Sequence, residues 1–473
     1  MISKIKLFSL ITIAAAIISS TVAFGSKEGH KLGSTDKFTA KLEQNGFIVT
    51  NGTAIHFDPI GQYCAGNLPN ALYANNGAPY AAAMVPDSPR GEAATPLAPE
   101  FRIAPDEAVV LIGWTPPEEK YFSYQIYLSH RLYPQETAPR FLLNSLGDTV
   151  NINTIHTIGS NPFNSPVVLI FTPDRNIESK VRKALLSSGY PSSIINTLVI
   201  PSAILKLGLD AKSDTFLIAN RNALFADQNA GDAYVANPTL AVFRVTPQKP
   251  NTLKPFPTPT LRIRGTGQTE MDLTPSLDRL RQAIIDANKG FTPTEYTTTP
   301  FAYEGYDYTQ RGVTTLGDTR DALYLCAGYM PEFNSFDELK LGDTDFLIAY
   351  GINHAATGKA TYANINGYAS KTDKLALGSV FSDDFEGSTD QYLGSEDPAG
   401  NLTYAYKISR YCKPNESYCL PLEVPSQCNN KLVLDSNTLL GIAFRLYLEP
   451  DTNIGAAYSE ILYDRIIKFS KSQ

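Results

Sequence analysis

Two histidines end strand-like segments and could act as metal ligands or as a general acid and base. His130 closes FSYQIYLSH and His354 closes FLIAYGINH, each eight residues after a phenylalanine. An imidazole titrates near neutral pH and offers a nitrogen to a proton or a metal ion. If the two segments occupy equivalent places in related domains, the imidazoles could converge between them. The alternative is that each is a half-buried histidine hydrogen-bonded to backbone at the end of its strand.

Two acidic turns could supply a carboxylate to such a site. Asp174 follows the strand-like VLIFTP, and Asp384 follows LGSVFSD. A secreted hydrolase or lyase could combine either carboxylate with the two histidines. The acidic stretch 382–397 also permits a calcium loop, because hard cations take several carboxylate oxygens from one loop. A solvated acidic loop is the commoner use of such a stretch.

Aromatic and basic side chains on other strand-like segments could bind a ligand. Trp114, the only tryptophan, stands near Tyr124, and these rings could stack on a sugar or an apolar molecule. Arg244 and Arg445 occupy the same place in two similar segments, and a guanidinium can hold an anion with two hydrogen bonds. The alternatives are that the tryptophan plugs a core and that each arginine pairs with a neighbouring carboxylate.

Several common catalytic motifs are missing from the chain. It contains no G-x-S-x-G elbow, no H-E-x-x-H pair, no Gly-rich phosphate loop and no EF-hand spacing. These absences remove several classes of hydrolase, metalloprotease and nucleotide-binding protein. We therefore assign no cofactor and no metal site.

The five cysteines indicate disulfides. Three of them crowd the loop-like stretch YCKPNESYCLPLEVPSQC, and in an oxidising compartment such a cluster favours disulfide bonds. We predict that Cys412 pairs with Cys419 and Cys64 with Cys428, although spacing alone does not determine connectivity. A zinc site is the rival interpretation, but the spacings lack a tight C-x₂₋₄-C knuckle. Cys326 lies in the apolar segment ALYLCAGY and is expected to be buried.

The chain also shows signs of an internal repeat. Residues 107–122 align without gaps with residues 321–336, and residues 240–247 resemble residues 442–450. Two further matches lie between these, at the segments that end in the histidines and at the two acidic turns. Four similarities in the same order favour a duplicated domain.

The local patterns predict strands far more often than helices. Short β-branched and aromatic runs bounded by Pro, Asn, Gly or Asp are typical of strands. Helices are expected at 177–188, at 275–287 after a cap at Thr274, and at 459–470. The dipeptide Asn51-Gly52 predicts a hairpin turn.

We therefore predict an α+β, β-rich fold with two similar β-dominated domains. The expected organisation is a signal peptide at 1–25, an N-terminal extension at 26–100 and a first repeat at 101–250. A Pro-rich linker and helix at 251–315 then lead to a second repeat at 316–473.

The first residues predict export. Lys4 and Lys6 precede an apolar run at 7–18, which is too short for a membrane span and is followed by small residues. Cleavage after Ala23 or Gly25 would leave a secreted or periplasmic protein with no membrane span. The net charge of −7 becomes more negative on loss of the two lysines and argues against a nucleic-acid partner.

These observations leave two functional hypotheses. The favoured one is a ligand-binding or surface-associated protein that holds a small molecule or saccharide in a groove between two related domains, because domain interfaces are preferred pocket sites. The alternative is a secreted hydrolase or lyase with a histidine and carboxylate site between the repeats.

Overall fold

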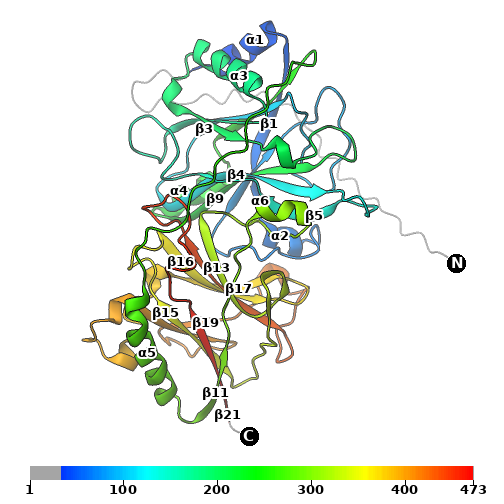
Figure 1. Cartoon of the computed structure of the whole chain (residues 1–473). Coiled ribbons are helices and arrows are strands. Elements are labelled where there is room, and N and C mark those ends of the chain that lie inside the picture. Colours follow the sequence, from blue (N-terminus) through cyan, green and yellow to red (C-terminus); the bar gives the residue numbers. More distant parts are fainter. Residues whose placement is uncertain (1–32, 472–473) are drawn as a thin grey trace, which may run out of the picture.

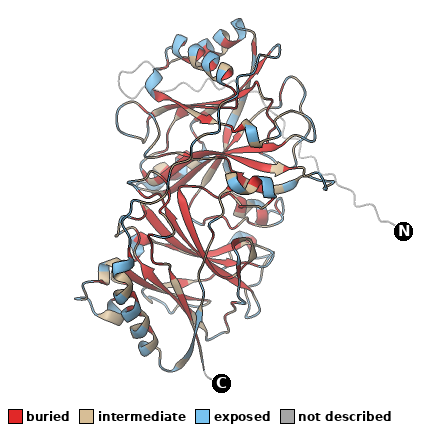
Figure 2. Cartoon of the chain, viewed as in Figure 1, coloured by how far each residue is buried: buried red, intermediate tan, exposed pale blue. Residues whose placement is uncertain are grey.

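The computed structural model describes residues 33–471, which form two β-rich halves stacked end to end (Figure 1). Buried residues follow the strands of both halves, and exposed residues lie mainly on helices and loops (Figure 2). The expected signal peptide lies outside the described residues. Within the described residues, no helix is both long enough and apolar enough to cross a membrane.

The first half is one ten-stranded sheet with strand order β5-β4-β9-β2-β1-β10-β3-β7-β8, and β6 pairs with β4. One face is covered by helices α1 and α3, and the other encloses a separate apolar core. The helices of this half are α1 (Thr35–Gln44), α2 (Pro59–Cys64), α3 (Arg175–Ser187) and α4 (Gln228–Ala236). Its strands are β1 (Phe47–Phe57), β2 (Tyr80–Met84), β3 (Ala108–Trp114), β4 (Glu119–Arg131), β5 (Arg140–Ser145), β6 (Val150–Asn151), β7 (Pro166–Thr172), β8 (Ile195–Val199), β9 (Thr215–Phe225) and β10 (Leu240–Pro247).

The second half contains two smaller sheets packed face to face. Their inner faces share one apolar core, in which Leu325 of β13 and Phe444 of β20 lie with Leu347 of β15. Helix α5 covers the outside of the β15 sheet. One sheet has the order β11-β21-β15-β18-β19 and the other β12-β13-β20-β16-β17, with β14 paired to β13. The elements are α5 (Thr274–Ala287), β11 (Phe291–Tyr296), β12 (Thr299–Pro300), α6 (Gly305–Tyr308), β13 (Ala322–Met330), β14 (Ser335–Phe336), β15 (Phe346–Ile352), β16 (Tyr362–Ala369), β17 (Leu375–Phe381), α7 (Asp390–Leu393), β18 (Thr403–Ser409), β19 (Cys419–Pro421), β20 (Leu440–Tyr447) and β21 (Arg465–Lys471).

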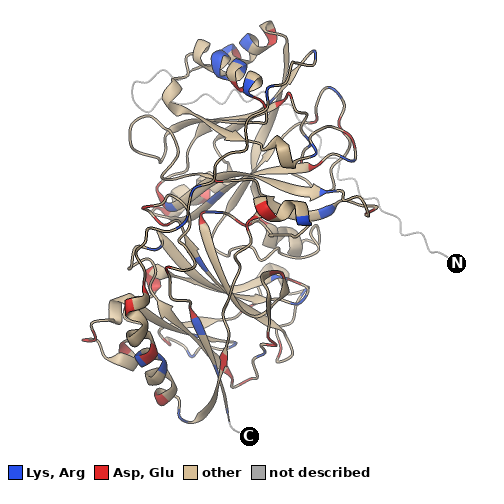
Figure 3. Cartoon of the chain, in the orientation of Figure 1, with Lys and Arg blue, Asp and Glu red and all other residues tan. Residues whose placement is uncertain are grey.

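The β-rich fold class is thus confirmed, and two of the three expected helices form. Helix α3 connects β7 to the parallel strand β8, so the expected β-α-β step is present. Helix α5 starts at Thr274 itself, whose hydroxyl donates to the carbonyl of Met271 rather than capping the helix from outside. Lys, Arg, Asp and Glu residues are frequent in α1, α3 and α5 (Figure 3), as expected for helices that bury only one face.

Two local predictions are wrong because distant strands override them. The Asn51-Gly52 pair lies inside the continuous strand β1, which is paired with β10 on one side and β2 on the other. A Cβ at Gly52 would lie 2.1 Å from the carbonyl oxygen of Met84, so the glycine permits close strand approach rather than a turn. The expected helix at 459–470 instead ends in strand β21, which pairs with both β11 and β15.

The segment expected as an N-terminal extension is built into the first half. Strands β1 and β2 lie in the middle of its sheet. Between them, the segment 58–80 runs to the second half, where the amide of Tyr73 donates to the carbonyl oxygen of Lys374 over 3.0 Å.

The duplication stays a prediction. The paired strands β3 and β10 resemble the paired strands β13 and β20, as the repeat predicts. However, β4 lies in the same sheet as β3, whereas β15 lies in a different sheet from β13. The topologies of the two halves therefore differ outside the matched pairs.

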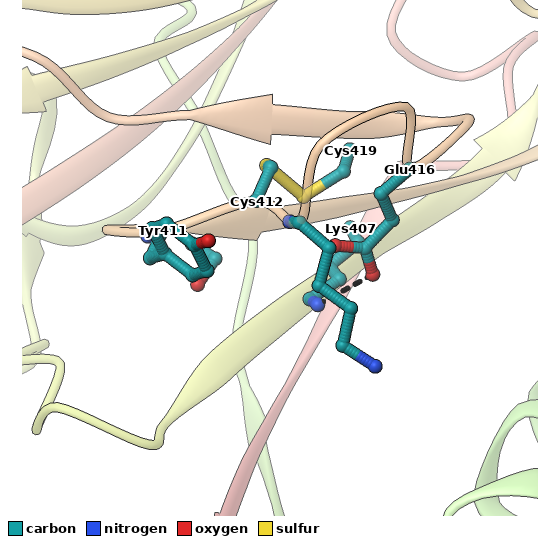
Figure 4. The surroundings of a disulfide bond; sticks show 7 residues. Lys407, Tyr411, Cys412, Glu416 and Cys419 are labelled. Carbon is teal, nitrogen blue, oxygen red and sulfur yellow. Dashed lines mark hydrogen bonds and ion pairs between the residues drawn. A yellow bond between two sulfur atoms is a disulfide. The ribbon is translucent and has the colours of Figure 1, made fainter.

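Both expected disulfides are present. Cys64 is joined to Cys428, which attaches the segment after β1 to the second half, and Cys412 is joined to Cys419 (Figure 4). Glu416 lies beside the second bond and accepts a hydrogen bond from Lys407 over 2.7 Å. These two cysteines and Glu416 are close enough together for a metal ion, but disulfide sulfurs are not thiolate ligands. Cys326 is free and buried, and burial raises the pKa of its thiol to about 12.

Removing the two disulfides separately should show that they contribute unequally to the free energy of unfolding. The Cys64–Cys428 bond spans 364 residues and the Cys412–Cys419 bond spans seven, and loop-closure entropy grows with loop length. We expect Cys64→Ser/Cys428→Ser to lower the free energy of unfolding by about 3–5 kcal/mol and Cys412→Ser/Cys419→Ser by about 2 kcal/mol. Urea denaturation of both double variants measures the difference, and an equal loss would contradict this assignment.

Candidate functional site: a pocket between the two halves

A pocket of about 80 Å³ lies where the two halves meet, walled by both halves and by the segment between β1 and β2. Strands β4 and β9 of the first half face strands β13 and β16 of the second there (Figure 1). Most of its lining side chains are aromatic or aliphatic, and two are arginines, Arg221 from β9 and Arg445 from β20. The pocket therefore combines an apolar wall with cationic groups from both halves.

Strand alternation explains which side chains reach the pocket. On β9, Leu217, Ala219 and Arg221 line it, whereas Phe216 and Ile218 enter the core of the first half. On β20, the same alternation turns Arg445 toward the pocket and its neighbours into the core of the second half. Successive side chains of a strand point to opposite faces, so each sheet contributes the face that its own core leaves uncovered.

The two pocket arginines form hydrogen bonds but no ion pair within the part of the chain that the structure describes. Arg221 donates to the hydroxyl of Tyr127 from Nε over 3.0 Å and from Nη2 over 2.8 Å, and also to the carbonyl of Gly317. Arg445 donates from Nη2 to the carbonyl of Tyr73 over 2.8 Å, and its guanidinium lies 5.5 Å from the ring centroid of Tyr368. The buried Nη1 of Arg445 has no hydrogen-bond partner among the described residues.

The tyrosines around these arginines are neutral at physiological pH. Burial raises the pKa of Tyr80, Tyr324 and Tyr127 above the ordinary value for a phenol. A neutral phenol offers the ring face to a cation and a hydroxyl for hydrogen bonding, but it does not cancel the charge of a guanidinium.

Asp318 is the carboxylate that lines the pocket, and its oxygens are already occupied. Oδ1 accepts from the amide of Ser145 over 2.9 Å and from the hydroxyl of Thr315 over 2.6 Å. Oδ2 accepts from the hydroxyl of Ser145 and the amide of Gly305. Asp318 thus links Ser145 of β5 to Gly305 and Thr315 by hydrogen bonds instead of forming an ion pair with either arginine.

Backbone strain gathers at this pocket. Leu72, Tyr73, Leu143 and Leu316 all line it, and all have positive φ, between 47° and 58°. Bulky residues rarely adopt this left-handed region, and such strain is concentrated at functional sites. The contacts around the pocket therefore hold these four rim residues in the unfavourable left-handed backbone conformation.

His130 and His354 do not form the composite site expected from the repeat. His130 Nδ1 lies 2.7 Å from Glu100 in the first half, and His354 Nδ1 lies 2.9 Å from Glu270 in the second. Among residues 33–471, neither histidine belongs to a cluster of three or more side chains close enough to hold a metal ion. Each imidazole is therefore a strand-end histidine with its own partner, which is a carboxylate rather than a backbone group.

The surroundings of His130 also exclude a serine-nucleophile arrangement. Ser129 and Glu100 both lie against the same nitrogen, Nδ1, at 3.3 Å and 2.7 Å. In a catalytic triad the acid binds one imidazole nitrogen and the nucleophile the other. The fully buried hydroxyl of Ser129 donates to Glu100. This hydrogen-bonded cluster therefore stabilises the end of β4.

Neither candidate carboxylate meets a histidine. Asp174 is the N-cap of α3 and accepts from the amides of Asn176 and Ile177 at 2.9 and 3.1 Å. Asp384 is exposed in the turn after β17. The expected histidine and carboxylate site is therefore not assembled.

The predicted ligand-binding residues are also dispersed, with one exception. Trp114 ends β3 beside Pro166 and Tyr190, whereas Tyr124 is fully buried in the core and packs on Phe122. The two rings share no groove. Arg445 is the exception because it lines the pocket between the halves.

Arg244 pairs with neighbouring carboxylates, as the alternative interpretation expected. It is fully buried and pairs with Glu92 and with Glu107, whose oxygen lies 2.7 Å from Nη2. The arginine charge keeps the pKa of Glu107 below its ordinary value despite burial.

Sequence reasoning missed Arg221 and the tyrosines that surround it. The available signal was a charged residue within the apolar strand TFLIANRNALF. Its partners are Tyr127 of β4, the ring of Tyr80 and the backbone carbonyl of Gly317, and no local pattern reveals that these distant segments approach it.

Comparison with known proteins adds no family. No protein-family model and no curated protein matches this chain. Solved structures with some likeness include an uncharacterised protein from Burkholderia cenocepacia, with 9% identity and a TM-score of 0.38 over 91% of this chain and 86% of that one. The VPA0106 protein from Vibrio parahaemolyticus has 11% identity and a TM-score of 0.37 over 84% of this chain and 90% of that one. Likenesses this weak carry no argument about function.

The buried His354 gives a pH dependence that can be measured. Burial alone would lower its pKa, but Glu270 and Asp464 raise it from 6.5 to about 10. Because the folded state raises the pKa of this histidine, the protonated imidazole stabilises the fold fully below pH 6.5. This contribution is lost as pH rises toward 10.

We expect the wild-type free energy of unfolding to fall by up to a few kcal/mol more than that of His354→Gln between pH 6.5 and 10. Urea denaturation across this range measures it. His156→Gln, at an exposed histidine, is the control and should follow the wild type. Parallel curves for His354→Gln and the wild type would refute the assignment.

Proposed function

We propose that this protein is exported and binds a small molecule in the pocket between its two halves. The observation that carries the proposal is a largely apolar pocket at the junction of the two halves, with two arginines that form no ion pair among residues 33–471. Small-molecule sites are typically mostly apolar clefts with a few converging polar groups, often at domain interfaces.

Binding is favoured over catalysis by the chemistry of the pocket walls. Its ionisable side chains are two arginines, the saturated Asp318 and tyrosines. An arginine stays protonated, and a phenol with a raised pKa is a poor base at neutral pH. The hydrolase or lyase hypothesis also loses support because its proposed residues lie with separate partners.

The size of the pocket favours a small molecule over a saccharide chain. Its volume is about 80 Å³, whereas drug-sized ligands occupy clefts of roughly 300–1,000 Å³. A pocket of this volume fits a single small ring or a short organic chain.

Export is supported by the two disulfides together with the charged and apolar start of the chain. Disulfides persist outside the reducing cytosol. The bond between Cys64 and Cys428 would also hold the segment that walls the pocket against the second half.

A neutral ring compound tests this proposal. We expect benzyl alcohol to bind with a Kd on the order of 1 mM, given its few heavy atoms, as measured by isothermal titration calorimetry. Phe57→Ala removes a ring from the pocket wall and should weaken binding roughly five-fold.

Ile48→Ala is the matched control, because it truncates an exposed apolar side chain at the other end of the same strand, β1. It should leave the affinity unchanged. No detectable binding to the wild type, or equal losses in the two variants, would contradict the proposed function.

A further inference from the structure

The pocket contains two buried cations, and neither pairs with a carboxylate of the described residues. Arg221 and Arg445 are 9% and 5% exposed, and neither forms an ion pair among the described residues. Burying an unpaired charge costs several kcal/mol unless another group compensates it.

Three other buried arginines of this chain pair with carboxylates. Arg131 pairs with Asp214, Arg244 with two glutamates, and Arg320 with Asp148. Arg102 donates to two backbone carbonyls and lines none of the pockets described. Of the three buried arginines that form no ion pair among residues 33–471, two therefore line this pocket.

Free hydrogen-bond donors also point to a ligand. Among residues 33–471, neither Nη1 of Arg445 nor the Nδ2 amide of Asn75, another lining residue, has a hydrogen-bond partner, and both atoms are buried. A buried donor left unsatisfied costs about 1–3 kcal/mol. An acceptor on a bound molecule would satisfy both groups.

The balance of charge favours a single negative charge on that molecule. The two arginines supply two positive charges and Asp318 one negative charge, and the neighbouring phenols are neutral. A monoanion would bring the lined space to neutrality. Phe57, Phe301 and Phe333 on the walls would meet an apolar body attached to the charge.

We propose that the ligand is a small carboxylic acid whose carboxylate lies between Arg221 of the first half and Arg445 of the second. This inference rests on the proposed binding function and names the class of ligand for the same pocket. A guanidinium matches a carboxylate with paired donors. Because one arginine comes from each half, the bound anion would also hold the halves together.

The test compares two molecules that share a ring and differ in charge. Calorimetry at pH 7 measures benzoate and benzyl alcohol on the full mature protein, with phenyl phosphate and inorganic phosphate as further arms. We expect benzoate to bind at least ten-fold more tightly than benzyl alcohol, because its carboxylate would accept charge-assisted hydrogen bonds from the arginines.

Arg445→Met should weaken benzoate at least ten-fold and change benzyl alcohol less than three-fold. Arg175→Met is the charge-matched control, because Arg175 is exposed at the start of α3 in the first half. It should bind benzoate like the wild type.

The outcomes separate this inference from the proposed function. If benzyl alcohol binds and benzoate binds no better, the anion inference is overturned and the binding function stands. If neither molecule binds, the proposed function fails, and the inference fails with it. Tighter binding of either phosphate compound than of benzoate would overturn the assignment of a carboxylate.

Thermal unfolding distinguishes a ligand-binding role from a packing role for Arg445. Replacing an uncompensated buried charge by an apolar group is often neutral or stabilising, so Arg445→Met should keep the Tm within a few degrees while losing the rise that benzoate gives the wild type. A large fall in Tm with the benzoate response intact would overturn the inference. Arg221→Lys, which keeps the charge but loses the planar fork, provides a second variant and should weaken benzoate binding at least three-fold.

Discussion

The buried carboxylate of Asp321 makes the contact on which the arrangement of the two halves depends. Asp321 stands at the start of β13 and is fully buried. It accepts hydrogen bonds from the hydroxyls of Tyr121 and Thr149 and the amide of Asn151, all in the first half. Burial raises the pKa of this carboxyl, and the three donors oppose that rise. Removing a donor would leave buried charge uncompensated, so the network sets the register of one half against the other.

The pocket follows from this register because each sheet has a second face that its own core does not use. Around Asp321 these faces pack through rings, with Tyr121 5.1 Å from Tyr447 between centroids. Beside that contact, the segment between β1 and β2 closes the space, anchored by the disulfide at Cys64. Leucines with left-handed backbone at the rim and unpaired arginines inside are both costly features in an apo protein. Their coincidence in one place is the physical reason to assign a ligand there.

The sequence predicted what short-range patterns determine. Apolar alternation located most strands, the helix after Asp174 formed, and the cysteines paired as expected. Where distant strands decide, prediction failed: Asn51-Gly52 has turn chemistry, yet two neighbouring strands hold it extended. Arg244 and Arg445 have the same local sequence pattern but different surroundings, since glutamates from residues 92 and 107 reach only the first. No local signal separates these two arginines, and none places Arg221 beside Arg445.

Crystallography with a marked ligand tests most directly whether a small carboxylate binds between the two halves. In crystals of the protein soaked in 4-bromobenzoate, anomalous scattering would locate the bromine. We predict a bromine peak in the apolar part of the pocket, with the carboxylate within hydrogen-bonding distance of Arg221 and Arg445. A well-ordered pocket without bromine, or a bromine bound only elsewhere, would contradict the claim.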